Sequence, residues 1–226
     1  MPIHPQFFPP LPNDAIASYD WQDLAEGTGI INYKLFTTTD STGDDYRLGT
    51  QELYSTIIDT RIVATSAHTS FTKLADLDFD LSVYNIQKQI KGTMVLQFSH
   101  VAKSNPAVAQ IEAYTVVRIR RWDGVAEHEV ALGQTKTLTP GAGGGEESEL
   151  VTMQIIIPKT DFAAEDALRV TIEMWIKAVG TGTPQGAYYL GHDPQNRDST
   201  YADGIKPSAD DLVQTFDIYT PYNIDK

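Results

Sequence analysis

The side chains of this chain that could do chemistry are its histidines, but their spacing gives no recognisable site. No two of them stand two or four residues apart, as metal ligands on one strand or helix would. The sequence has no cysteine and no serine-nucleophile, phosphate-loop or dinucleotide motif. We therefore expect no enzyme, no resident metal and no cofactor. The histidines are His4, His68, His100, His128 and His192.

Alternating carboxylates at Asp76, Asp78 and Asp80 allow a second kind of chemistry. On a strand they would lie on one face, roughly 6.5–7 Å apart. Such an array could hold calcium or supply the acid and base of glycoside hydrolysis. It is also the ordinary pattern of a strand with one solvated face, and we favour that interpretation. The acidic residues within 40–45 are similarly interpreted as a polar turn, so calcium has no support.

His192 and Asp193 form the remaining pair of chemical interest, in the sequence HDPQNR. A catalytic histidine–aspartate pair needs a nucleophile, which the sequence does not identify. Before Pro194, the Asp193 side chain can instead accept backbone amide hydrogen bonds and begin a turn. We interpret the two residues as a structural turn.

The composition of the chain argues against two classes of partner, nucleic acids and membranes. It has 226 residues and a net charge of −13, so it would repel the phosphates of nucleic acid. No apolar stretch is long enough for a membrane-spanning helix. We expect neither nucleic acid nor a membrane as a partner.

The elements that must position these residues are strands. In residues 168–177 apolar and polar side chains alternate strictly, which predicts a strand with one buried face. About nine such segments, separated by turn signals, predict an all-β fold: an antiparallel, jelly-roll-like β-sandwich. One segment, Thr160 to Ala167, is instead expected to be a helical turn. The other strand candidates are 30–37, 52–64, 77–83, 93–100, 111–122, 127–132, 150–157 and 187–190.

Three regions are predicted along the chain. Residues 1–13 form a proline-rich arm, residues 14–197 form the sandwich, and residues 198–226 are a C-terminal extension. The extension contains a strand candidate, 212–219, which either pairs with the sheet or reaches another chain. The arm is either disordered or docks on a neighbouring subunit. The expected interface residues are Ile3, Phe7, Phe8, Leu11, Trp175, Tyr219 and Tyr222.

Trp175 lies on the polar face of its predicted strand, so its surroundings bear directly on function. An exposed aromatic side chain on a sandwich can stack on a sugar ring or anchor a protein interface. The first use describes a carbohydrate-binding module for attachment to host-surface glycans, and the second describes a self-associating protein.

Residues 168–197, LRVTIEMWIK to YYLGHDPQNR, resemble segments of β-sandwich structural proteins from virions of tailed bacteriophages or related prokaryotic viruses. The resemblance implies a capsid, decoration, spike or tail component that binds copies of itself and other virion proteins. It implies assembly in the host cytoplasm and residence in the virion, and it carries no catalytic residues.

Overall fold

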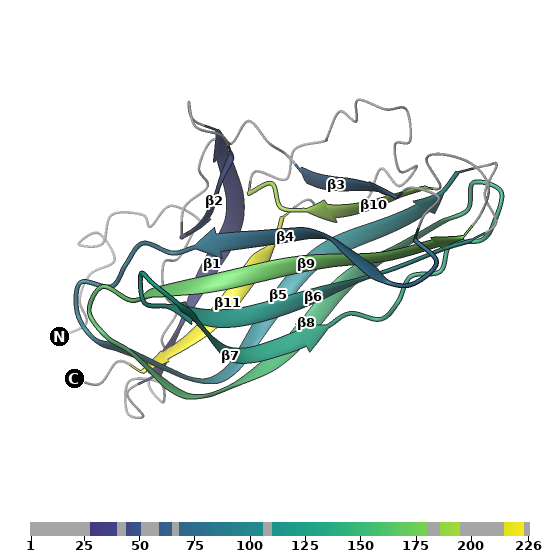
Figure 1. Cartoon of the computed structure of the whole chain (residues 1–226). Coiled ribbons are helices and arrows are strands. Elements are labelled where there is room, and N and C mark those ends of the chain that lie inside the picture. The colour runs from purple at the N-terminus through teal and green to yellow at the C-terminus, as the bar shows by residue number, and fades with distance from the viewer. Residues whose placement is uncertain are drawn as a thin grey trace, which may run out of the picture.

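The computed structural model describes residues 28–39, 44–50, 59–64, 68–105, 110–179, 186–194 and 215–223. All regular structure in these ranges is β-strand, which confirms the predicted all-β class (Figure 1). No helix within these ranges is long and apolar enough to cross a membrane. Residues 1–27 and 195–214, which hold the arm and most of the extension, lie outside the description.

Within the described ranges, eleven strands form one sheet that folds over on itself as a β-sandwich. They are β1 (Thr28–Thr39), β2 (Asp44–Gly49), β3 (Asp59–Ala64), β4 (Thr72–Asp80), β5 (Lys88–Ser104), β6 (Gln110–Trp122), β7 (Glu127–Gln134), β8 (Glu146–Phe162), β9 (Ala167–Val179), β10 (Gly186–Gly191) and β11 (Asp217–Asn223).

One layer runs β4–β9–β6–β7 and is antiparallel throughout. In the other layer β8 pairs along one edge of β5. The opposite edge of β5 is shared by β11 and β10, and β1 and β2 follow β11. The layers are joined by a single parallel bridge between Arg47 on β2 and Asp80 on β4. Figure 1 shows β9 and β6 crossing in front of β5 and β8.

The core lies between the two layers and follows the predicted alternation. From the β9 side come five fully buried residues, one at every second position from Leu168 to Ile176. Met94, Leu96 and Phe98 of β5 meet them from the other layer as part of the same cluster. Burial of this alternating apolar set is what fixes which face of each strand points inward.

The predicted helical turn at Thr160–Ala167 is wrong. Strand β8 continues to Phe162, because Thr160, Asp161 and Phe162 pair with the start of β5. The chain then turns, and the Asp166 carboxylate accepts a 2.7 Å hydrogen bond from the Ala163 amide. Pairing with a long neighbouring strand outweighs the local helical preference of this segment.

The C-terminal strand belongs to the chain's own sheet. Strand β11 lies between β1 and β5 and pairs antiparallel with both. Of the two alternatives for this segment, the structure shows the terminal strand that pairs with the sheet. It begins at Asp217, because residues 215 and 216 are not in strand conformation, and residues 212–214 of the predicted strand lie outside the described ranges.

Candidate functional site

The outer face of the β4–β9–β6–β7 layer carries a network of paired charges. Arg169 holds the Asp80 carboxylate through two hydrogen bonds of 2.6 and 2.7 Å and lies 2.6 Å from Glu127. Its guanidinium also covers the Trp122 ring at 4.5 Å. The hydrogen bonds that Arg169 donates to Asp80 raise the pKa of Arg169 above the usual arginine value. This arginine on β9 therefore ties together the strands β4, β6 and β7.

The alternating aspartates are members of this network. Asp78 accepts a hydrogen bond from Thr171 and lies 3.6 Å from Arg169, and Asp76 pairs with Lys73. Carboxylates already paired with cations are poor ligands for calcium. Among the described residues no group of three or more acidic or histidine side chains is placed to hold a metal ion. The solvated-face interpretation fits this arrangement.

An aromatic cluster occupies the other end of the same face. Trp175 on β9 stands directly opposite Tyr114 on β6, and their rings are nearly parallel, with centroids 6.1 Å apart. Phe71, just before β4, meets the Tyr114 ring edge-on at 4.9 Å. All three side chains are half-buried, so each keeps part of its ring in solvent. We call Phe71, Tyr114 and Trp175 the aromatic platform.

Buried charge fixes the orientation of the platform. The indole nitrogen of Trp175 donates a 3.0 Å hydrogen bond to Glu173, which also accepts one of 2.9 Å from Arg118. Burial acts to raise the pKa of Glu173, but the hydrogen bonds from Arg118 and Trp175 outweigh it and the pKa is lowered. Glu173 is therefore an ionised anchor beneath the indole.

The opposite outer face, on the β8–β5–β11–β1 layer, carries mostly uncharged side chains. Gln154, Val95, Tyr219 and Asn32 stand opposite one another across its four strands. The nearest charged pair, Lys34 and Asp217, is neutralised by a 3.0 Å contact. We call the outward, uncharged side chains of these strands the neutral face: Leu150, Thr152, Gln154, Ile156, Thr93, Val95, Gln97, Tyr219, Pro221, Ile30 and Asn32.

Apolar side chains are unusually exposed on the neutral face. Ile156 is 78% exposed, Leu150 62% and Ile30 44%, while Val95 and Tyr219 are half-buried. Large exposed apolar residues grouped on one sheet face are typical of a surface that binds another protein.

The predicted interface residues fall in different places. Tyr219 is on the neutral face and Trp175 on the platform, so the structure does not bring these two together. Tyr222 points into the core, where its hydroxyl lies 2.7 Å from that of Tyr84 and 3.1 Å from that of Tyr33. Ile3, Phe7, Phe8 and Leu11 lie outside the described residues. Whether any of the seven contacts another chain stays a prediction.

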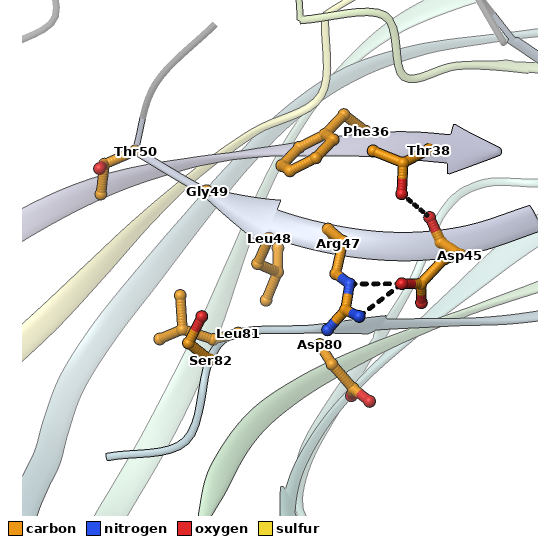
Figure 2. Close-up of a pocket in the computed structure, with 10 residues that line it drawn as sticks. All are labelled: Phe36, Thr38, Asp45, Arg47, Leu48, Gly49, Thr50, Asp80, Leu81 and Ser82. Atoms are coloured by element: carbon orange, nitrogen blue, oxygen red, sulfur yellow. Dashed lines mark hydrogen bonds and ion pairs between the residues drawn. The ribbon is translucent and has the colours of Figure 1, made fainter. Parts of the chain in front are cut away.

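A pocket of about 550 Å³ opens where β2 approaches β4 (Figure 2). Its floor is apolar, with Phe36 and Leu48 buried. Its charged groups are already paired, since Arg47 bonds Asp45 at 2.8 Å and Asp80 is held by Arg169. The pocket therefore offers no uncompensated charge to a ligand.

Two histidines, His100 and His192, are buried in the core. His100 lies 2.7 Å from the Tyr188 hydroxyl and 3.2 Å from Glu149. His192 packs edge-on against Phe79, and burial lowers its pKa to about 4. Sequence reasoning missed the roles of His100, Phe71 and Tyr114, because each depends on a partner from a distant strand. The only sequence signal was that Tyr114 shares a strand face with Arg118.

Comparisons with known proteins find only distant structural similarity. No family model and no curated protein matches the chain. Similar solved structures include a CocE/NonD family hydrolase from Staphylococcus aureus (12% identity, TM-score 0.36, 70% of this chain and 36% of that one). An α-amino acid ester hydrolase is similar at 11% identity (TM-score 0.41, 84% and 35%). Infectious bursal disease virus, Gx strain, is similar at 11% identity (TM-score 0.28, 93% and 59%).

The expectation that the chain is not an enzyme is wrong on these comparisons, because two of the similar structures are hydrolases. The chain spans about a third of the length of those hydrolases. Their activities are those of the whole proteins, and at this identity the likeness assigns no reaction and no residue to the present chain.

Proposed function

We propose that the chain is a structural protein of a virus particle that acts by binding copies of itself through the neutral face. The observation that carries this proposal is the set of exposed apolar and uncharged polar side chains on that face, where the Lys34–Asp217 pair is neutralised, in a chain of net charge −13. Two copies repel each other over most of their surfaces, and an uncharged, partly apolar face is where repulsion is least and burial gains most. The viral setting comes from the resemblance of residues 168–197 to phage sandwich proteins.

The proposed occupant of the neutral face is the N-terminal segment of a second copy. Residues 1–13 contain no acidic, lysine or arginine side chain, and they include Ile3, Phe7, Phe8 and Leu11. The segment leads towards β1, whose Ile30 is at one side of the face. Fully extended, the residues between Leu11 and Ile30 span roughly 60 Å, enough to reach a neighbouring subunit. An uncharged apolar segment matches an uncharged apolar face.

Removal of residues 2–13 tests this occupant. We expect the full chain to sediment as an oligomer and the shortened chain to sediment at a smaller mass at the same concentration. A matched variant with Phe7 and Phe8 both changed to Ser keeps the length and should behave like the shortened chain. An unchanged oligomer in both variants would contradict the role of the segment.

The viral setting has a separate test. Mass spectrometry of density-purified virus particles from the source should find the chain at a constant ratio to the other particle proteins. Recovery only in the soluble fraction would overturn the virion assignment, whatever the oligomeric state.

A further inference from the structure

The aromatic platform has features that the proposed self-association does not use. It lies on the β4–β9–β6–β7 layer, whereas the neutral face belongs to the other layer. Three aromatic side chains from three separate strand regions converge there without being fully buried. Aromatic residues that served only the core would be covered by other residues. A sheet face that only met solvent would not need three aromatic rings.

Neighbouring side chains hold Trp175 and Phe71 of the platform in place. Glu173 holds the Trp175 indole, and the side chain of Glu173 is itself only 4% exposed. Phe71 is held from the other side, because the Lys177 ammonium lies 5.9 Å from its ring centre and 2.7 Å from Glu112. Because these side chains are already held in place, a ligand that stacks on them loses little free energy to side-chain ordering. This favours binding even though the platform is a small surface.

The rim of the platform limits the charge of its ligand. Lys73, Lys177 and Arg118 border it, and each is paired with a carboxylate from Asp76, Glu112 or Glu173. A charged ligand would have to break one of these pairs. Paired carboxylates still have unused lone pairs, and ammonium groups have further N–H donors. The rim therefore suits an uncharged ligand with many hydroxyl groups.

Stacking and an uncharged hydroxylated rim together describe a sugar ring. The axial C–H groups of a hexopyranose form an apolar face that packs on aromatic rings, while its hydroxyl groups point outward. The bases of a nucleic acid would also stack, but the phosphates of its backbone would meet a chain of net charge −13. We propose that Phe71, Tyr114 and Trp175 form a binding site for an uncharged polysaccharide.

Affinity electrophoresis of the full chain tests this site. The gels contain dextran, galactomannan or xyloglucan as neutral probes, and alginate as an acidic one. We expect at least one neutral probe to retard the protein and alginate to leave its mobility unchanged. Trp175→Ala should weaken the retardation at least tenfold in apparent affinity, because it removes the indole ring of the site.

Trp122→Ala is the matched control. Trp122 is the same residue type on the same outer face, but it lies beneath Arg169 at the other end. We expect Trp122→Ala to bind the probes like the natural chain. Equal loss in both tryptophan variants, or no retardation by any neutral probe, would overturn the proposal. The variant Ile156→Glu changes the neutral face and leaves the platform untouched. It should therefore bind the neutral probes as the natural chain does.

Discussion

Tyr188 and His100 face each other inside the sandwich, with the phenol oxygen 2.7 Å from the imidazole Nδ1. The same hydroxyl lies 2.6 Å from Thr115 on β6, and the other imidazole nitrogen lies 3.2 Å from Glu149 on β8. Four strands from both layers thus meet in one buried polar chain. Such a chain holds the layers in register, because each buried polar group has its partner on another strand.

Tyr188→Phe should therefore lower the stability of the fold, although it removes a single oxygen atom. The change leaves both Thr115 and His100 without this partner in the core, and we expect a loss of about 1–3 kcal/mol in the free energy of unfolding. Urea unfolding followed by fluorescence measures it. Tyr114→Phe on the outer face is the control and should change stability by less than about 0.5 kcal/mol. Equal stabilities of the two variants would show that the buried chain contributes nothing.

Acidification should destabilise the fold before most carboxylates titrate. Burial lowers the pKa of His192 to about 4 and also lowers that of His100. An unfolded histidine takes up its proton near pH 6.5, so between pH 6.5 and 4 the unfolded state binds more protons than the folded one. The free energy of unfolding therefore falls as the pH drops through this window, by about 3 kcal/mol at pH 4 from His192.

Urea unfolding at pH 7 and pH 4.5 measures this effect, with His192→Gln as the comparison. The variant should be less stable at pH 7, because it alters a buried packing site, yet should lose less stability on acidification. If the natural chain and the variant lost the same amount, protonation of His192 would not be the cause.

Gly133→Ala tests how closely β7 packs against β8 at the edge of the sandwich. A Cβ at Gly133 would overlap Met153 Sδ and lie 3.0 Å from Ile155 Cδ1. Both side chains belong to the core, so we expect a loss of about 1–3 kcal/mol from overpacking. Gly141→Ala is the control, because nothing lies within 4 Å of its Cβ position. A Gly133→Ala variant with an unchanged melting temperature would mean that the edge of the sandwich is loosely packed.

The all-β class and the inward face of most strands could be predicted from the sequence because alternation is a local pattern. Leu168 to Ile176 is the clearest case, with every predicted inward residue buried. Thr160 to Phe162 could not be placed, since their local preference is helical and only pairing with β5 makes them a strand. Local sequence also does not reveal which strands are neighbours.

The candidate surfaces depended on those non-local pairings. Trp175 was recognisable as an outward residue, but its partner Tyr114 became evident only from the register of β9 against β6. Tyr222 was predicted to lie in an interface. Its hydroxyl lies instead in the core, beside that of Tyr84. The neutral face could not be predicted from the sequence, because its residues come from four strands spread between Ile30 and Pro221.

Copies of the chain are proposed to bind one another through the neutral face, and sedimentation velocity of Ile156→Glu tests this binding. Ile156 is 78% exposed at the middle of β8, so a carboxylate there should leave the fold intact while placing charge in the proposed contact. Val125→Glu is the matched control, since Val125 is 87% exposed in the β6–β7 turn, away from that face. We predict that the natural chain and Val125→Glu sediment as the same oligomer and that Ile156→Glu sediments as a smaller species. An Ile156→Glu chain that keeps the oligomer of the natural protein, or a natural chain that is monomeric at all concentrations, would show that the neutral face does not mediate self-association.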